Sequence, residues 1–302
     1  MNRQDLTFSS GRDRCAAWLY PAAGGAPGAP VIVMAHGFTG TRRDRLGPFA
    51  ERFAAAGVAA MPFDYRGFGD STGAQDIVDI DRQLEDWRAA IAFARSLPGI
   101  DPSRVAVFGS SMGGGHALAA AAGDSRVVAA ISQVPFLDLA RQAYRPARSV
   151  LAQMREAAKL DAEAAARGDP PRFLPAVGQP DEPAFINAPG GETGWRRVVA
   201  MGEDSRWRNR AAARFLLAGP YRSAQFAAKL HCPWLVCVAE DDNIAAPAAA
   251  IEAARSAPLG ELRLYPGVNH FDVYDGEPFE ALVTDELEFL HRHLRSGNAT
   301  ST

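Results

Sequence analysis

The chain has 302 residues, of which 47% are hydrophobic and 22% are charged, and its formal net charge is -3. A chain of this length can bury one large core, with or without a subdomain. Its weakly acidic balance is unlike the strong basic bias of nucleic-acid-binding proteins and of proteins held on anionic membranes. We therefore expect neither a nucleic acid nor a membrane as partner.

The predicted elements alternate between strands and helices along the chain. In chain order they are two short strands within 5–20, a strand at 31–36, a helix at 46–56, a strand at 58–63, a helix at 81–97, a strand at 104–109, a helix at 112–122, strands at 127–134 and 233–240, a helix at 246–257, a strand at 261–266 and a helix at 278–294. This alternation predicts the α/β class, with a mostly parallel central sheet and helices on both faces.

One stretch departs from this alternation. Residues 136–230 separate two consecutive predicted strands, and this stretch is about three times longer than a usual crossover connection. It contains a helical run near 140–167, followed by a segment rich in proline and glycine. We interpret 136–230 as an inserted, mainly helical cap, and 1–135 with 231–302 as the core.

The cysteines and the N-terminal segment bear on location. Cys15, Cys232 and Cys237 are odd in number and match no metal-binding spacing. The first residues, MNRQDLTFSSGRDR, lack the apolar segment of a secretory signal. We expect reduced, buried thiols, a cytoplasmic location and no metal site. The oligomeric state stays open, with a homo-oligomer as one alternative.

The segment Gly109-Ser110-Ser111-Met112-Gly113 fits the pattern G-x-S-x-G between a predicted strand and a predicted helix. This context is typical of a nucleophile elbow, a strained turn that lifts a serine oxygen above the sheet edge. Glycines two residues before and after Ser111 bracket it symmetrically, whereas Ser110 would need glycines where Phe108 and Met112 stand. We therefore predict that Ser111 is the nucleophile.

A serine nucleophile needs a histidine base, and that base needs an orienting acid. His270 directly follows the last predicted strand, at the edge where loops of parallel sheets carry chemistry. The other five histidines precede the serine, lie on its own helix, precede a strand or lie on the last helix: His36, His116, His231, His291 and His293. We predict His270 as the base.

The last predicted strand, at 261–266, leads to His270. We expect the acid to follow the strand before it, at 233–240. The segment there offers Glu240, Asp241 and Asp242. Because side chains alternate in extended chain, only one of the two adjacent aspartates can face His270. Asp138, after the strand at 127–134, is an outside candidate.

The anion that forms when serine attacks a carbonyl needs N–H donors around it. The residue after the nucleophile supplies one, which is the backbone N–H of Met112. The loop after the strand at 31–36 should supply the other, and its sequence HGF makes the N–H of Phe38 the best candidate.

Together these segments resemble the α/β-hydrolase superfamily. HGFTG, DYRGFGDSTG, GSSMGG, DDNIAAP and GVNHF occur in its usual order and spacing over nearly the whole chain. The resemblance implies the α/β-hydrolase fold and selects Asp242 as the acid, because the family's acid precedes a variable residue, an aliphatic residue and a later proline. It implies no metal and no organic cofactor.

The predicted cap is similar to a narrower group. GDPPRFLPAVG, GWRRVVAM and WRNRAAARFLLAGPYR resemble the cap of polyketide-transferase-like and dienelactone-hydrolase-like hydrolases. This implies a serine hydrolase that cleaves a small-molecule ester or thioester through an acyl-enzyme, or an acyltransferase that uses the same triad with an alcohol acceptor. A peptidase or a non-catalytic binding protein is less favoured, because no propeller or large N-terminal domain is present and no triad member is missing.

The insertion is also rich in aromatic residues. They are Phe173, Phe185, Trp195, Trp207, Phe215 and Tyr221. Because the strands on both sides of the insertion deliver their carboxyl ends to the catalytic face, the cap should cover Ser111. We expect some of these aromatic residues to line an apolar pocket there, and we select Trp195, Trp207 and Tyr221 as substrate-binding residues.

Overall fold

A computed structural model describes residues 3–25, 27–219 and 221–294 of the chain. Its centre is an eight-stranded sheet in the order β1-β2-β4-β3-β5-β6-β9-β10. The strands are β1 (Gln4–Ser10), β2 (Asp13–Leu19), β3 (Ala29–Ala35), β4 (Ala59–Phe63), β5 (Ile100–Ser110), β6 (Val127–Gln133), β9 (Trp234–Ala239) and β10 (Gly260–Tyr265). Among the described strands of this sheet, only the pairs β1–β2 and β2–β4 are antiparallel.

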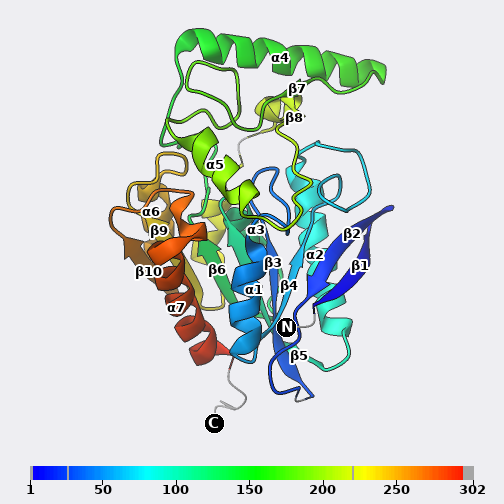
Figure 1. The fold of residues 1–302 in the computed structure, drawn as a ribbon, viewed down its shortest axis with the longest axis vertical. Helices are drawn as coiled ribbons and strands as arrows, with labels where there is room; N and C mark the ends of the chain where they lie inside the picture. The colour runs from blue at the N-terminus through cyan, green and yellow to red at the C-terminus, as the bar shows by residue number, and fades with distance from the viewer. Residues whose placement is uncertain (1–2, 26, 220, 295–302) are drawn as a thin grey trace.

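Helices cover both faces of this sheet (Figure 1). Helices α1 (Leu46–Ala55) and α7 (Gly276–His293) pack on one face, and α2 (Ile80–Ser96), α3 (Met112–Gly123) and α6 (Pro247–Ser256) pack on the other. The predicted fold class is confirmed.

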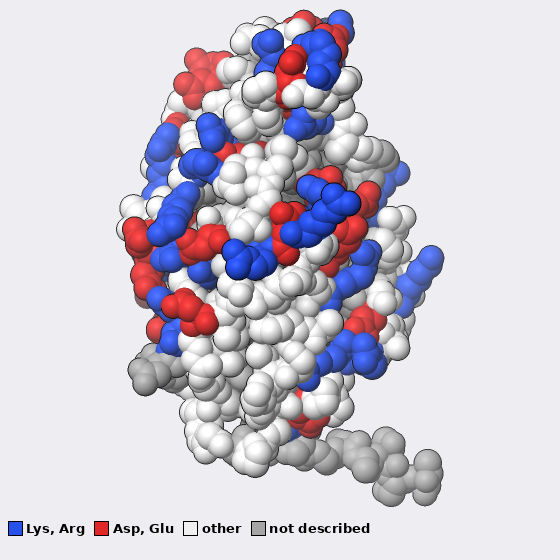
Figure 2. All heavy atoms as spheres, turned by 90° about the vertical axis from the view of Figure 1, so that its right-hand side faces the viewer, with Lys and Arg blue, Asp and Glu red and all other residues white. Residues whose placement is uncertain are grey.

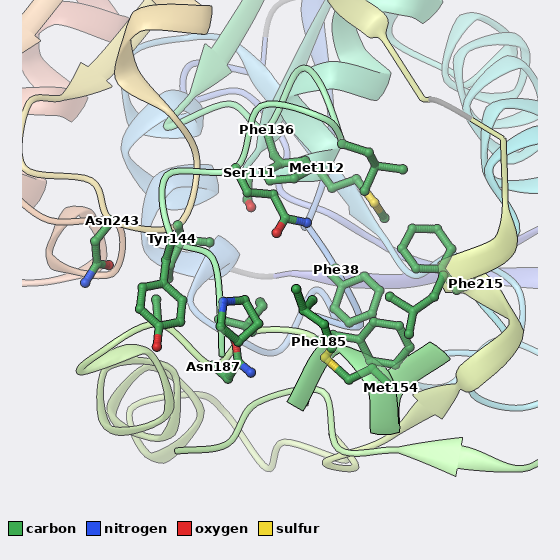
Figure 3. A pocket seen from close by; sticks show the side chains of 18 residues that line it. Phe38, Ser111, Met112, Phe136, Tyr144, Met154, Phe185, Asn187, Phe215 and Asn243 are labelled. Carbon is green, nitrogen blue, oxygen red and sulfur yellow. The ribbon is translucent and has the colours of Figure 1, made fainter. Parts of the chain in front are cut away.

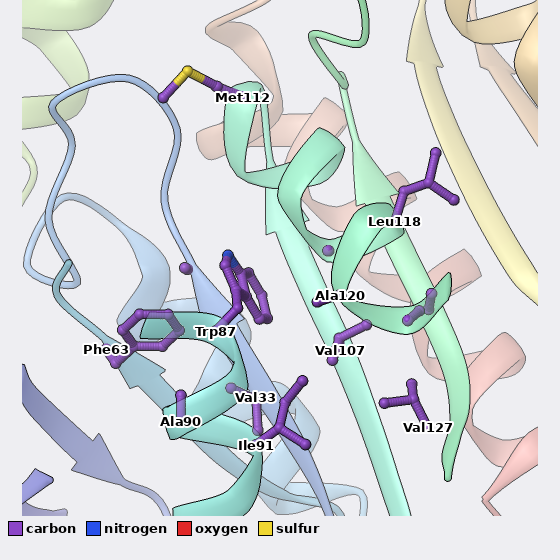
Figure 4. Packing of buried hydrophobic residues seen from close by; sticks show 14 of the residues in the cluster. Val33, Phe63, Trp87, Ala90, Ile91, Val107, Met112, Leu118, Ala120 and Val127 are labelled. Carbon is purple, nitrogen blue, oxygen red and sulfur yellow. The ribbon is translucent and has the colours of Figure 1, made fainter. Parts of the chain in front are cut away.

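Alternation of side chains along the central strands builds one apolar cluster on each face. In β3, Val31 and Val33 belong to the cluster under α2 and α3, whereas Ile32 and Met34 belong to the cluster under α1 and α7. Figure 4 shows Val33 of this strand near Trp87 of α2. Burial on both faces explains why the central strands are continuously apolar in sequence.

Two predicted boundaries were wrong. Strand β5 begins at Ile100 instead of 104, because its pairing with β3 tolerates a register shift beside Pro102, which lacks the N–H that a regular ladder needs. The first cap helix, α4 (Arg148–Arg167), begins well after 140. Pro146 disfavours helical geometry in the residue before it, so 140–147 forms a loop instead.

The insertion between β6 and β9 lies above the carboxyl edge of the sheet, with α4 farthest from the core (Figure 1). After α4 come β7 (Phe173–Leu174), α5 (Gly191–Ala200), β8 (Ala211–Ala212) and two 3-10 helices, η1 (Ala213–Leu217) and η2 (Ser223–Lys229). The η2 helix packs against α3 and α6. The last residues of the predicted cap segment therefore join the helical layer of the core.

The surface carries both signs of charge. Figure 2 shows basic and acidic side chains interspersed on the face it presents, without a large area of one sign. Many of the arginines are paired with carboxylates, as in Arg206 with Asp70 and Arg141 with Glu252. No helix within the described residues has the length and apolarity to cross a membrane. The three cysteines are buried and form no disulfide.

Candidate active site

The turn between β5 and α3 holds Ser111 in a strained backbone conformation, with φ at 55° and ψ at -123°. Positive φ is costly for a residue with a side chain, and it persists only where the surroundings enforce it. A Cβ atom on Gly109 would overlap the carbonyl of Gly113, and one on Gly113 would overlap the carbonyl of His36. The two glycines therefore let the strand, the helix and the first loop meet closely enough to form the turn.

The structure separates the two adjacent serines. Ser110 is fully buried, and its Oγ lies 2.5 Å from the hydroxyl of Tyr274 and 3.3 Å from Nε2 of Gln133. Ser111 is partly exposed and borders a pocket under the cap. This placement agrees with the glycine bracket that distinguished Ser111 in the sequence.

Ser111, His270 and Asp242 meet at the carboxyl edge of the sheet. The Oγ of Ser111 lies 3.0 Å from Nε2 of His270, and Nδ1 of His270 lies 2.6 Å from Oδ2 of Asp242. The histidine and aspartate side chains are 1% and 3% exposed, so solvent does not weaken their bond. A histidine held in this way can accept the serine proton at Nε2 while the carboxylate stabilises the resulting cation.

Local hydrogen bonds fix Asp242 in place. It lies in the loop between β9 and α6, where its Oδ1 accepts the backbone N–H groups of Ile244 and Ala245, both at 2.8 Å. Its neighbours Glu240 and Asp241 are exposed. The sequence left this acid open until the family resemblance selected Asp242, and Asp242 is the carboxylate that the structure brings to His270.

The remaining candidates lie elsewhere. Asp138 accepts the backbone N–H of Ala140 and faces Arg222 at 3.8 Å. His116 is buried in α3, where Nε2 lies 2.9 Å from Oε1 of Gln83 and Nδ1 contacts the hydroxyl of Tyr221. Burial lowers the pKa of His116 to about 3, so this histidine stays neutral. Within the described residues, no group of three or more His, Cys, Asp or Glu is arranged to hold a metal ion.

The loop after β3 passes directly over Ser111. A Cβ atom on Gly37 would lie 2.7 Å from Cβ of Ser111, and Phe38 and Met112 border the same pocket as Ser111. In the described part of the chain, neither the N–H of Phe38 nor that of Met112 has a hydrogen-bond acceptor. The N–H of Met112 also belongs to the first turn of α3, where the helix dipole favours negative charge.

A pocket of about 860 Å³, including its open mouth, leads from Ser111 into the cap. Figure 3 shows Phe38, Phe185, Phe215 and Met154 gathered on one side of it. Most of its walls come from the insertion: from the loop after β6, from α4, from the chain before α5 and from η1. An apolar acyl group can leave water for this wall, with a gain of about 0.8 kcal/mol for each buried CH₂ group.

Polar side chains occupy the other side of the pocket. Figure 3 places Tyr144, Asn187 and Asn243 there. Sequence reasoning missed all three, because they stand in loops without periodicity. Only Asn243 carried a signal in the sequence, because it directly follows the candidate acid Asp242.

The three cap residues selected from the sequence do not share this pocket. Trp195 borders a small cavity beside Ser111 and His270, but not the large pocket. Trp207 borders a separate polar pocket and donates from Nε1 to Oγ1 of Thr39 at 3.0 Å. Tyr221 packs against His116 in the core layer. Of the aromatic residues that the sequence pointed to in the insertion, Phe185 and Phe215 line the large pocket. Substrate binding by Trp195, Trp207 and Tyr221 stays a prediction.

A family model described as serine aminopeptidase, S33, matches residues 27–276. The quorum-quenching protein AidA of Acinetobacter baumannii is 41% identical over 95% of this chain and 94% of its own length. The chain belongs to the α/β-hydrolase family. The motif order, the elbow and the strand order of the sheet are all in keeping with that membership.

Two further proteins resemble the chain over nearly its full length. The polyketide transferase af380 of Aspergillus fumigatus is 29% identical over 97% of this chain and 99% of its own. The crystal structure of the α/β hydrolase GrgF from Penicillium sp. sh18 superposes with a TM-score of 0.83, at 24% identity, covering 97% of this chain and 99% of that one. The match to these proteins includes the insertion.

Proposed function

We propose that this α/β hydrolase cleaves a small-molecule carboxylic ester or thioester through an acyl-enzyme on Ser111. The observation that carries the proposal is the hydrogen-bonded series from Ser111 through His270 to Asp242 at the mouth of an apolar pocket. A serine oxygen next to a neutral imidazole gains nucleophilicity only if the imidazole can take its proton, and the distances on both sides of His270 permit this.

In the acylation step, Oγ of Ser111 attacks the substrate carbonyl and its proton passes to Nε2 of His270. The backbone N–H groups of Phe38 and Met112 stabilise the oxyanion of the tetrahedral intermediate. The intermediate collapses when the bond to the alcohol or thiol breaks, and His270 returns its proton to that leaving group. The carboxylate of Asp242 holds the histidine tautomer and stabilises the transient cation.

In the deacylation step, water takes the place of the leaving group. His270 accepts a proton from water as the oxygen attacks the acyl carbonyl, and the second tetrahedral intermediate expels Ser111, which regains its proton from His270. The product is a carboxylic acid. Apart from the substrate and water, every step described uses side chains and backbone groups of this chain.

The lining of the pocket supports a medium-sized acyl group with an apolar or aromatic body. Phe185 and Phe215 come from the insertion, so we also propose that 136–230 acts as the substrate-binding cap. Aromatic side chains contribute large contact areas and favour offset or edge contacts with other rings.

The test is a panel of p-nitrophenyl esters and acyl thioesters of graded length, assayed with wild type, Ser111→Ala and Ser110→Ala. We expect wild-type turnover on part of the panel and a loss on the order of a million-fold in kcat for Ser111→Ala. Ser110→Ala removes the same atom one residue earlier and should keep most activity. An inactive wild type, or an active Ser111→Ala protein, would overturn the proposal.

Acyl transfer to an alcohol is the second candidate, and the 29% identity to a polyketide transferase over 97% of the chain favours it. The chemistry differs only in the nucleophile that attacks the acyl-enzyme. Competition between water and alcohols for the acylated protein separates the two. Transfer is shown if the ratio of ester to free acid exceeds the ratio of alcohol to water in the assay. Formation of free acid alone would exclude transfer to the alcohols tested.

A further inference from the structure

Asp44 is a buried carboxylate that the proposed reaction does not use directly. It is fully buried, and it stands at the end of the loop between β3 and α1 that carries Phe38. Its Oδ2 accepts both the backbone N–H and the hydroxyl of Thr41 at 2.8 Å, and its Oδ1 accepts the hydroxyl of Ser205 at 2.5 Å. The Asp44 carboxylate thus links the loop that carries Phe38 to the insertion.

The backbone of Asp44 fixes the other end of the same loop. Its carbonyl oxygen lies 2.8 Å from Nε2 of His36, and Nδ1 of His36 lies 2.8 Å from the backbone nitrogen of Gly37. Because the Gly37 N–H can only donate, Nδ1 accepts and Nε2 carries the hydrogen that is donated to Asp44. Burial lowers the pKa of His36 to about 4, which keeps the ring in this neutral form.

Side chains of the insertion also hydrogen-bond to the middle of the loop. Oγ of Ser205 accepts the backbone N–H of Trp207 at 3.2 Å, and Nε1 of Trp207 donates to Oγ1 of Thr39 at 3.0 Å. Thr39 is the residue after Phe38, and its backbone has a φ of 56°. A side chain at such a φ is strained, so the loop needs outside contacts to keep this conformation.

We infer that Asp44 is a positioning residue that holds the Phe38 N–H in place for the oxyanion and couples that position to the insertion through Ser205. The inference rests on the proposed function. Oxyanion stabilisation depends on donors held about 2.7–3.1 Å from the oxyanion, and a shift of about 1 Å can reduce the rate on the order of 100-fold. The carboxylate accepts three donors at once, which the neutral amide of asparagine cannot do.

The test compares Asp44→Asn, Ser205→Ala and Asp76→Asn with wild type. Asp76 also holds the insertion, through Arg208 and Arg210, but it makes no hydrogen bond to the loop from Gly37 to Asp44. It is therefore a matched control for a loosened insertion. The readouts are kcat and KM for acetyl and octanoyl p-nitrophenyl esters, and the affinity of trifluoromethyl ketones, which form a tetrahedral oxyanion adduct with serine.

For Asp44→Asn we expect kcat to fall on the order of 10- to 100-fold on both esters alike, with KM changed less than about threefold. Affinity for the ketone should fall by the same factor as kcat/KM, because both depend on oxyanion binding. Ser205→Ala should show the same pattern with a smaller loss. Asp76→Asn should leave both the turnover of the acetyl ester and the affinity for the acetyl-sized ketone unchanged.

The inference is overturned if folded Asp44→Asn keeps wild-type kcat and ketone affinity, or if its loss grows with acyl length as in a loosened cap. Thermal unfolding monitors folding, and if Asp44→Asn does not fold, Ser205→Ala decides by the same readouts. A wild type without turnover on any ester or thioester would overturn the proposed function and this inference with it. A normal wild type with an unaffected Asp44→Asn would overturn this inference alone.

Discussion

Asp242→Asn is the substitution whose result the structure predicts in most detail. In the wild type, Oδ1 of Asp242 accepts two backbone N–H groups while Oδ2 faces Nδ1 of His270. In the asparagine variant only the amide oxygen can accept those two N–H groups, so the NH₂ group must turn toward His270. Nδ1 then has to accept a hydrogen bond, and the imidazole hydrogen moves to Nε2, where it faces Ser111 and blocks proton uptake.

The expected loss in kcat is about 10⁴-fold, the magnitude that the same substitution causes in a serine protease triad. This corresponds to about 5.4 kcal/mol of lost transition-state stabilisation. Solvent cannot compensate for the wrong tautomer, because the side chains of His270 and Asp242 are nearly inaccessible. Asp241→Asn is the matched control: Asp241 is exposed, so we expect less than about a twofold change.

The assay is kcat on the best p-nitrophenyl ester for wild type, Asp242→Asn and Asp241→Asn, with unfolding curves to show that each variant is folded. A loss below about tenfold at Asp242, or equal losses at both positions, would refute the tautomer argument. The orienting acid would then have to be sought elsewhere, and Asp138 would be the first residue to test.

Three further outcomes follow from the pocket, the core and the elbow. Phe215→Ala should lower kcat/KM for octanoyl or aromatic acyl esters at least about tenfold more than for acetyl esters, and an equal loss across the panel would exclude Phe215 from acyl binding. Glu286 is fully buried without a hydrogen-bond partner among the described residues, and burial raises its pKa well above the ordinary value. Above about pH 4.5, Glu286 keeps its proton in the folded state but loses it in the unfolded state. The free energy of unfolding therefore falls as pH rises toward the folded-state pKa, by up to about 1.4 kcal/mol per pH unit. Glu286→Gln should remove that slope in denaturant unfolding measured from pH 4.5 to 8, and parallel curves for both proteins would contradict a shifted pKa. Gly109→Ala should cost about 1–3 kcal/mol or prevent folding, whereas Gly123→Ala, which meets no atom within 4 Å, should be neutral or stabilising in the same unfolding measurement.

The parts of the site that lie at strand ends could be predicted from the sequence. Glycines 109 and 113 mark the elbow because the close approach of three backbone segments leaves no room for Cβ atoms there. His270 follows the last strand, and the parallel arrangement of β6, β9 and β10 brings its loop to Ser111. The acid needed the family resemblance, because alternation alone could not say which aspartate faces inward.

Which residues of the insertion line the pocket could not be predicted, for a physical reason. The described residues of the segment 168–222 form few regular elements, so no period of 2 or 3.6 indicates which side chains share a face. Tyr221 was selected as an aromatic residue of the insertion, but its hydroxyl contacts buried His116 and its chain joins the core layer. Phe215 reaches the pocket because η1 turns it toward Phe38, a contact between segments far apart in sequence.

The central claim is that Ser111 is the nucleophile, and covalent labelling tests it most directly. A fluorophosphonate probe reacts when an activated serine oxygen displaces fluoride from phosphorus, and peptide mass mapping locates the adduct. We predict one adduct on Ser111 in wild type, the same adduct in Ser110→Ala, and none in Ser111→Ala. An adduct on Ser110, or labelling of Ser111→Ala to the wild-type extent, would contradict the account.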